Sequence, residues 1–572
     1  MAPPAGALRE NVHRARWQGE PDFAKEHVMS NSLPSRRSLW IAILASSLCA
    51  TTDLHAQASP AEVARQLDQL LTEEVGAQAG TRRAGDEVFL RRVFLDIVGE
   101  PPGSDEVLAF VLDDRPDKRA RVLKQLLADD AYGKNWGRFW RDVIMFRRTE
   151  DRALRSQPAL EEFLVDQFNA NTPWNEIATR LITARGNVQD NGSTGLIMAQ
   201  GGRPEDTVAE ISRIFIGIQI QCAQCHDHPT DRWTREQFHQ LVAFFPRVAV
   251  RPMMGDNRSF AVVADDLPSR RRTNNNNRFR GTLEHYMPDL EDPQARGTLM
   301  QPVFFVTGQQ LETGVLDEAR RGQLSRWLTS PENPWFARAL VNRLWSELVG
   351  EGFYEPVDDI GPDRECSAPR TLELLSSQFV ENRYDTKWLM ETILLTATYQ
   401  LESSDRRTAD ELPFQANCPQ RLRSDQLFNS LLSVFDIQET ANRAGGNGRG
   451  AYGPQSRSGP RLLFNSIFGF DPSTRRDEVA GSIPQALAMM NSPFISQQIN
   501  ARRGRVLPGL LSEVSSDRQL VEELYLRVLS RQPTRQELKV CLDYRKDISI
   551  RAEAFEDILW ALLNHSEFIH RK

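Results

Sequence analysis

The sequence lacks an apolar run long enough to cross a membrane. A spanning helix needs about 20 apolar residues, whereas the best candidate, Leu39 to Ala50, has twelve. This run follows Arg36-Arg37 and precedes Ala56-Gln57-Ala58, which is the charged, apolar and small-residue order of a cleavable secretory signal. We therefore expect residues 1–58 to be an upstream extension and signal peptide. The mature chain is then periplasmic or secreted and has no transmembrane anchor.

An excess of basic charge is also missing. The chain has 70 Lys and Arg against 77 Asp and Glu, a formal net charge of -7. Binding to nucleic acid depends on neutralising phosphates with basic side chains, so we expect no nucleic-acid partner. The hydrophobic fraction of 40% and the charged fraction of 26% are typical of globular proteins. Because one hydrophobic core stops growing at roughly 250 to 300 residues, 572 residues predict more than one domain.

Cysteine is scarce, with six residues in the whole chain, one of them (Cys49) in the expected signal. An odd and sparse remainder does not form a disulfide framework in an exported protein of this size. The close pair among them therefore draws attention. The five remaining cysteines are Cys222, Cys225, Cys366, Cys418 and Cys541.

Apolar residues recur at helical spacing along most of the chain, which predicts a mainly α fold. We expect two helical domains, 60–250 and 315–572, joined by a connecting region at 251–314. One aromatic stripe is interpreted as core rather than as a cofactor site. It consists of Trp136, Phe139, Trp140, Val143 and Ile144.

The connecting region departs from the helical pattern. Ser259–Ala264 and Pro302–Val306 are typical of short strands, and the Arg- and Asn-rich stretch 270–277 between them is predicted to be a polar loop. A second glycine-rich stretch, 444–460, is also predicted to be a surface loop. The apolar residues of 211–220 favour a buried helix leading into the close cysteine pair, with a strand as the alternative.

The sharpest chemical feature is Cys222-Ala223-Gln224-Cys225-His226. Two thiols three residues apart can add to the two vinyl groups of haem, and the adjacent imidazole can bind the iron. We therefore expect haem c at Cys222, Cys225 and His226, in the compartment where such attachment takes place. The far side of the iron has candidate ligands in Met253, Met254, His285 and Met287.

Two other chemistries stay open. Carboxylates and imidazoles follow the motif, so a site for zinc or another divalent metal is an alternative. A structural disulfide or a redox dithiol is the second, although no βαβ pattern surrounds the pair. The candidate metal ligands that join the thiols are His226, Asp227, His228, Asp231 and His239.

The run from Arg213 to Phe245 resembles the planctomycete cytochrome-like secreted family called domain of unknown function 1549, through Gly217 to Gln221 before Cys-Ala-Gln-Cys-His-Asp-His-Pro and Asp231-Arg232-Trp233 after it. Arg91 to Gly99 and Tyr132 to Trp140 are similar to the N-terminal helices of that family. The resemblance covers roughly 60–250. It implies haem, without a defined reaction.

Downstream motifs resemble the companion domain of unknown function 1553 over roughly 315–565. They are Asn333 to Arg338, Val341 to Trp345, Glu355 to Pro362 and Met490 to Phe494. Two residues depart from these family patterns, Thr230 in place of an aromatic residue and Ala368 in place of a histidine. Asp358, Asp359 and Asp363 are interpreted as caps and loop anchors rather than as a metal site.

Two functional hypotheses result. The first is a haem-binding redox or electron-transfer module fused to a helical interaction domain, with redox or cell-envelope proteins as partners. The second is a metal-dependent hydrolase or binding protein of the cell envelope that uses the cluster at 222–239.

Overall fold

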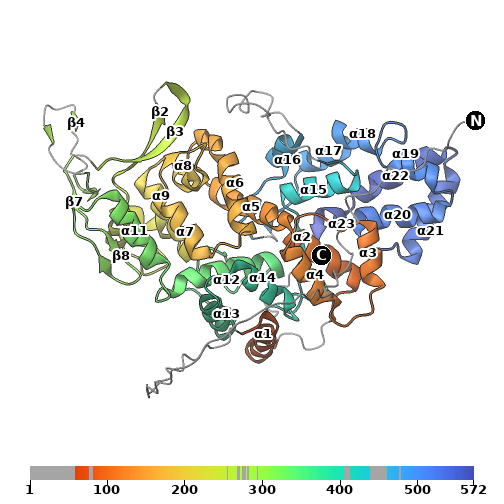
Figure 1. Cartoon of the computed structure of the whole chain (residues 1–572), viewed down its shortest axis with the longest axis horizontal. Coiled ribbons are helices and arrows are strands. Elements are labelled where there is room, and N and C mark those ends of the chain that lie inside the picture. The colour runs from red at the N-terminus through yellow and green to blue at the C-terminus, as the bar shows by residue number, and fades with distance from the viewer. Residues whose placement is uncertain are drawn as a thin grey trace, which may run out of the picture. The chain divides into compact units, whose positions relative to one another are not determined.

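The computed structural model describes residues 58–76, 82–253, 255–266, 271–272, 278–279, 283–292, 294–404, 412–438, 460–475 and 478–572 (Figure 1). Helices dominate these residues and the strands are short, which confirms the mainly α prediction. The expected signal lies outside the described residues except for Ala58, and so do Met254 and residues 444–459.

The helices before the connecting region begin soon after the expected cleavage site. They are α1 (Pro60–Val75), α2 (Asp86–Ile97), α3 (Ser104–Val111), α4 (Lys118–Leu127), α5 (Asp130–Met145), α6 (Gln157–Asn169), α7 (Trp174–Thr183), α8 (Gly195–Ala199), α9 (Pro204–Ile211) and α10 (Arg235–Val242).

Short antiparallel strands occupy the connecting region and a few places outside it. They are β1 (Gly186–Asn187), β2 (Val248–Met253), β3 (Asp256–Ala264), β4 (Arg271–Arg272), β5 (Arg278–Phe279), β6 (Tyr286–Met287), β7 (Thr298–Leu299), β8 (Val303–Phe304), β9 (Gln309–Gln310), β10 (Gln420–Arg421) and β11 (His570–Arg571). The largest sheet has the order β1-β3-β2, and the others are pairs. The predicted strand at 259–264 is confirmed as part of β3, and of the strand predicted at 302–306 only Val303–Phe304 form one, β8. Within the stretch predicted as a polar loop, Arg271–Arg272 form a strand instead, because they pair with β5.

Helices resume after residue 316. They are α11 (Asp317–Leu328), α12 (Pro334–Val349), α13 (Pro369–Glu381), α14 (Thr386–Leu395), α15 (Ser424–Val434), α16 (Pro460–Phe468), α17 (Ile483–Asn491), α18 (Pro493–Ile499), α19 (Leu507–Glu513), α20 (Asp517–Leu529), α21 (Arg535–Asp547), α22 (Arg551–Leu563) and α23 (Ser566–Ile569).

Local signals explain where many of these helices begin. The Ser59 side chain accepts a hydrogen bond from the Glu62 N–H at the start of α1, and Pro60 occupies the first helical position, where its missing N–H costs nothing. Gly76 ends α1 in the left-handed conformation that glycine tolerates best. Thr234 and Gln237 form a reciprocal capping box at α10. The start of α10 is therefore encoded next to the cysteine motif.

The aromatic stripe of α5 is core, as predicted. Trp136, Phe139 and Trp140 are at most 1% exposed, and the Trp140 ring lies 4.4 Å from that of Trp174 between ring centroids. Such aromatic pairs add stabilisation beyond the apolar area that they bury. The core beneath the N-terminal helices is thus built from residues whose spacing already indicated burial.

Helices from both ends of the described chain pack together, within one compact unit that spans residues 57–572. Arg91 on α2 donates hydrogen bonds to the carbonyl oxygens of Val528 and Phe568, and the Arg571 Nε lies 2.7 Å from the Asp96 carboxylate. In Figure 1 the orange helix α3 lies beside the blue α20. The predicted domain limits at 250 and 315 stay a prediction, which the sites of first cleavage in limited proteolysis would test.

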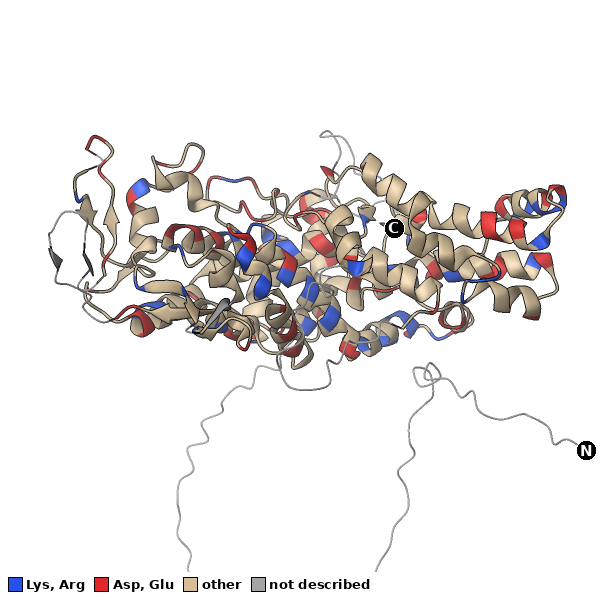
Figure 2. Cartoon of the chain, turned by 90° about the horizontal axis from the view of Figure 1, so that it is seen from above, with Lys and Arg blue, Asp and Glu red and all other residues tan. Residues whose placement is uncertain are grey.

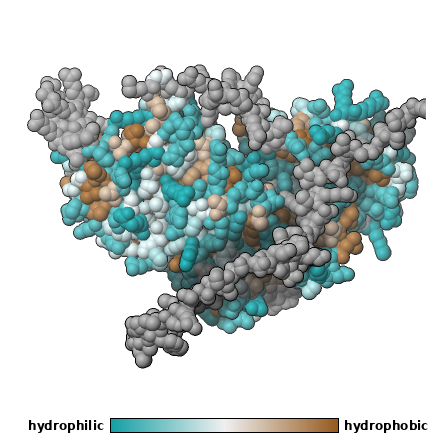
Figure 3. Space-filling model, in the orientation of Figure 1, coloured by the Kyte–Doolittle hydropathy of each residue, from teal (hydrophilic) through white to brown (hydrophobic). Residues whose placement is uncertain are grey.

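Charge is mixed over the molecule. Figure 2 shows basic and acidic residues interspersed along the helices, and the surface in Figure 3 is largely hydrophilic, with separate apolar areas. Among the residues described here, no helix combines the length and the apolar character that crossing a bilayer requires.

Candidate functional site

The helix that leads to the cysteine motif stops before it. α9 continues as a π-helical turn, Ser212–Ile216, and ends at Gly217, whose φ of +66° is a backbone conformation that favours glycine. A Cβ atom at Gly217 would also overlap the Ile360 side chain, whose backbone N–H donates to the Gly217 carbonyl at 2.7 Å. The predicted buried helix over 211–220 is therefore correct only as far as Ile216.

The cysteines themselves lie on a separate 3-10 turn, Ile220–Gln224. Ile220 and Ala223 point into the protein and are fully buried, whereas Cys222 and Cys225 are exposed and neither is in a disulfide. The alternation follows from the tight turn, which holds its apolar residues in the core and leaves the residues between them outside. Both thiols are thus accessible to a reagent or cofactor from solvent.

His226 is held in one useful orientation. Its Nδ1 lies 2.7 Å from the carbonyl oxygen of Asp227. Because a carbonyl oxygen only accepts, Nδ1 carries the proton, and the lone pair of the neutral ring is then on Nε2. A backbone carbonyl that fixes the tautomer in this way is typical of histidines that bind a metal through the other nitrogen. The exposed imidazole therefore offers Nε2 as a ligand.

The polar residues after His226 shape the loop. An Asp227 carboxylate oxygen accepts from the Arg235 N–H at 2.9 Å and so caps α10. The His228 Nδ1 accepts from the Thr230 N–H at 3.3 Å, and the His228 N–H donates to the Trp233 carbonyl at 2.8 Å. These contacts fold 227–235 back on itself. They also engage Asp227 and His228, two of the candidate ligands of the metal alternative.

His239 is buried, on the other side of the same loop. Its Nε2 lies 3.1 Å from the Gln224 carbonyl and its Nδ1 lies 2.8 Å from Nε2 of His285. Since the carbonyl only accepts, His239 donates from Nε2, and its Nδ1 accepts the hydrogen bond that the N–H of His285 Nε2 donates. Burial lowers the pKa of His239, and burial together with the neighbouring ring lowers the pKa of His285 to about 4. The pair is therefore neutral and ties the cysteine turn to the connecting region.

The metal alternative gains no support from this arrangement. Within the described ranges, no three His, Cys, Asp or Glu side chains are grouped as a cation site. Of the candidates for a far axial ligand, His285 is engaged with His239, Met253 is 38% exposed at the end of β2, and Met287 lies in β6. A pocket lined by residues such as Arg343, Glu347 and Arg475 includes no residue of the motif.

A buried ion-pair network lies next to the motif. The Asp358 carboxylate, 1% exposed, lies 2.8 Å from Arg213 and 3.5 Å from Arg343, and Arg147 approaches it to 3.9 Å. Burial raises the pKa of Asp358, but the arginines lower it by more, so the pKa falls below its ordinary value. Gln219, just before the cysteine turn, donates to the other Asp358 oxygen at 3.1 Å.

The loop that follows Asp358 contacts the residues that come directly after the motif. Arg364 donates to the carbonyl and the hydroxyl of Thr230 at 2.9 and 3.0 Å, and Arg232 pairs with Asp363 at 2.7 Å. Gly361 packs against Asp231 so closely that a Cβ would overlap the carboxylate. Burial and the nearby Asp363 raise the pKa of Asp231. We refer to residues 358–364 as the clamp loop.

The clamp loop accounts for the three aspartates that the sequence singled out. Asp358, Asp359 and Asp363 pair with Arg213, Arg364 and Arg232 respectively, so the prediction that they anchor loops is confirmed. Sequence reasoning missed the arginine partners and the His239–His285 pair. The only available signal was the accumulation of Arg, Asp and His in both segments, which does not reveal pairing. Thr230 and Ala368, the two departures from family patterns, lie at the clamp loop contact and in the buried start of α13.

Comparison with known families assigns both halves of the chain. Residues 65–250 match PSCyt2, a protein of unknown function (DUF1549), and residues 320–545 match PSD1, a protein of unknown function (DUF1553). No curated protein and no solved structure matches the chain. The cysteine turn and His239 thus belong to the first matched region, and the clamp loop belongs to the second.

Proposed function

Since the chain carries a PSCyt2 domain followed by a PSD1 domain, we propose that it is an exported cell-envelope protein that holds one c-type haem at Cys222, Cys225 and His226. The observation that carries the proposal is the hydrogen bond from His226 Nδ1 to the Asp227 carbonyl, beside two exposed free thiols. This donor set fits haem c, because it combines two accessible sulfurs with one imidazole nitrogen free to bind iron.

The residues of the turn have separate roles in haem binding. Cys222 and Cys225 would hold the haem covalently, because the S–H of each thiol can add across one vinyl C=C bond with no leaving group. His226 would bind the iron through Nε2, and the Asp227 carbonyl holds the ring in that orientation. Haem, once bound, supplies one-electron chemistry. The cytochrome-like name of the first domain agrees with this proposal.

The exposure of the site supports electron transfer. The thiols and His226 are accessible from solvent, so a redox partner can approach them.

The test is covalent haem content. The full chain is expressed with the cytochrome c maturation machinery, denatured, and analysed by mass spectrometry and by absorption in the Soret region. We expect a mass increase of one haem in the parent and none in a Cys222→Ala/Cys225→Ala variant. His226→Ala is expected to lower haem incorporation or to change the iron spectrum. Cys366→Ala, which removes a half-buried cysteine elsewhere, is the matched control and keeps the adduct.

A colourless parent protein of unmodified mass under these conditions contradicts the proposal. Stoichiometric zinc in that colourless protein, lost in the double cysteine variant, would favour the metal alternative instead. Export is tested separately by N-terminal sequencing of the protein recovered outside the cytoplasm, where we expect a new terminus close to Ala58. A chain that keeps its original N-terminus contradicts export.

A further inference from the structure

Exposed apolar side chains are concentrated on α16 and α17, two helices that touch each other. Three of them, Ile483, Leu487 and Met490, follow the i, i+4, i+7 spacing that brings residues to one face of a helix. Ile483 is 76% exposed and Leu487 is 53% exposed. The stripe, as we call the whole set, consists of Leu462, Leu463, Ile483, Leu487 and Met490.

The helix beneath the stripe is anchored. Met489 on the other side of α17 is 5% exposed and belongs to the hydrophobic core of the C-terminal helices. The Gln485 side chain donates to the Ile467 carbonyl at 2.9 Å and accepts from Arg421 at 2.7 Å. Because α17 is held from behind, its exposed face is a defined surface. An apolar surface fixed in this way is a candidate interaction site.

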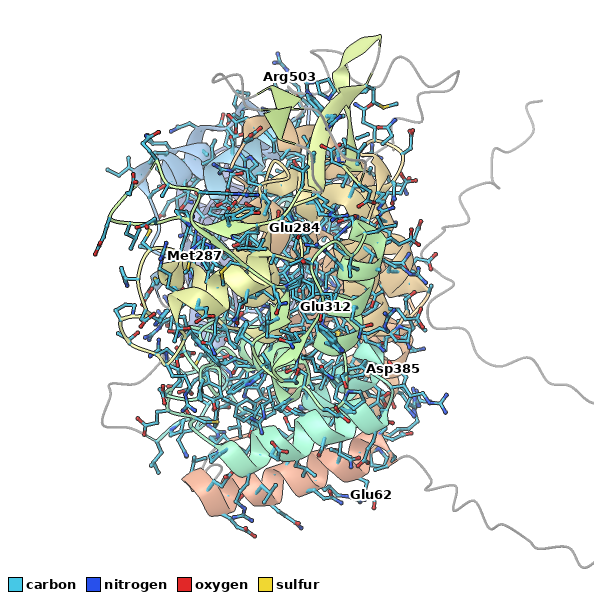
Figure 4. All side chains as sticks on the ribbon, turned by 90° about the vertical axis from the view of Figure 1, so that its left-hand side faces the viewer. Glu62, Glu284, Met287, Glu312, Asp385 and Arg503 are labelled. Atoms are coloured by element: carbon cyan, nitrogen blue, oxygen red, sulfur yellow. The ribbon has the colours of Figure 1, made fainter. Side chains whose placement is uncertain are left out.

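Exposed basic charge follows the stripe in the sequence, in a turn where one acidic side chain, that of Glu556, accepts a hydrogen bond from the Ala501 N–H. Arg502, Arg503 and Arg505 are exposed in the turn between α18 and α19, and no ion pair is recorded for them within the described ranges. The sequence contains no Asp or Glu from Val479 to Ser512, although the whole chain carries a net charge of -7. Figure 4 places Arg503 at the upper edge of the molecule, the edge at which α16, α17 and α18 lie in Figure 1.

We propose that the stripe and this arginine turn form a docking surface for an anionic lipid bilayer. Helices that lie on membranes bury an apolar face at the headgroup boundary and carry arginines that bind anionic headgroups. The stripe is aliphatic, whereas protein interfaces are enriched in aromatic side chains. A bilayer also suits a face of two neighbouring helices, because it needs no groove. The chain is then a peripheral membrane protein.

The molecule contains an internal comparison for this proposal. Leu108, Val111 and Leu112 at the end of α3 are 40%, 40% and 77% exposed, so they offer a similar aliphatic surface. Their neighbours Asp105, Glu106, Asp113 and Asp114 are acidic, and Asp113 is paired with Arg115 and Arg121. This mixed charge gives an anionic bilayer no net attraction to the surface. The α3 surface is therefore the matched control, alike in apolar exposure but without an excess of basic charge.

The experiment is co-sedimentation of the full chain with vesicles of phosphatidylglycerol and phosphatidylcholine, compared with vesicles of phosphatidylcholine alone. All variants share the same N-terminal residues, so differences between them report on the substituted surface. We expect binding to the anionic vesicles only, weakened by salt. Arg502→Gln/Arg503→Gln/Arg505→Gln is expected to lower the partition coefficient about a hundredfold at low ionic strength. Ile483→Ser/Leu487→Ser is expected to lower it about tenfold or more.

The control variant Leu108→Ser/Leu112→Ser is expected to bind like the parent. Circular dichroism and sedimentation velocity establish that each variant is folded and report its oligomeric state. The proposal is overturned if the parent does not bind anionic vesicles. It is also overturned if the arginine variant and the stripe variant both bind as the parent does. It is also overturned if Ile483→Ser/Leu487→Ser instead converts a dimer to a monomer, because the stripe is then covered by a second copy.

Discussion

The cysteine turn and the Asp358 network lie side by side in this protein, yet they differ in almost every physical respect. The turn exposes Cys222, Cys225 and His226 and holds them with few contacts. The network buries Asp358 and Arg343 to within 3% of full burial and joins residues that both matched domains provide. The two regions thus serve different purposes. Reactive groups must be accessible from solvent, whereas the elements that position them are held by ion pairs that are buried away from water.

The largest effect on stability is expected from a substitution in the buried Asp358 network. Asp358→Asn removes the one carboxylate that faces Arg213, Arg343 and Arg147 together. Arg213 keeps its ion pair with Glu210 and Arg147 keeps that with Asp471, whereas the buried Arg343 loses its carboxylate partner. Removing one partner of a buried ion pair costs about 3 to 5 kcal/mol. We expect a drop of this size in the free energy of unfolding, measured by urea denaturation.

The matched control is Asp363→Asn, which removes the exposed partner of Arg232 in the same loop. Exposed ion pairs contribute little because water and salt screen them, so this variant is expected to unfold at the same urea concentration as the parent. Equal losses in the two variants would mean that the network is not the stabilising part of the clamp loop.

An intermediate effect is expected from the His239–His285 pair, which ties the cysteine turn to the connecting region by way of Gln224. Both rings have a lowered pKa, that of His285 being about 4. Between pH 6.5 and pH 4, the His285 ring is therefore more protonated in the unfolded chain than in the folded chain. Stability from His285 is fully present above pH 6.5 and is lost on acidification, by roughly 2 to 3 kcal/mol at pH 4.

Other groups titrate in the same window, so the measurement is a difference between two proteins. His285→Gln keeps an N–H donor for His239 but has no imidazole to protonate. Its unfolding free energy is expected to fall less steeply than that of the parent from pH 6.5 to pH 4. Parallel pH profiles would show that His285 does not contribute to acid sensitivity.

The smallest effect on stability is expected from substitutions in the exposed cysteine turn. In the apo chain, Cys222→Ser/Cys225→Ser should change the unfolding free energy by less than about 0.5 kcal/mol, as is usual for surface substitutions. The same substitutions remove covalent haem if the proposed function holds. A large loss of stability in the apo variant would instead assign the two thiols a structural role.

The site was only partly predictable because its contacts differ in range. The Cys-X-X-Cys-His spacing and the capping box of α10 are local, so the residues that form them are neighbours in the sequence. The ion pair of Arg213 and Asp358 joins residues 145 positions apart, and the two histidines are 46 apart. One arginine in a chain with so many charged residues gives no sign of which carboxylate it meets.

The sequence by itself determined the helices, the core stripe of Trp136 and Trp140, the family pair and the cysteine motif, because periodicity and spacing act within a few residues. Tertiary structure alone decided that the helix stops at Gly217, that His239 is paired rather than available, and that the clamp loop contacts the residues on both sides of the cysteine turn. These outcomes depend on which distant segments are packed together. When a charge or an imidazole is buried beside such a segment, it forms a hydrogen bond or an ion pair with it, because leaving a buried polar group unpaired costs free energy.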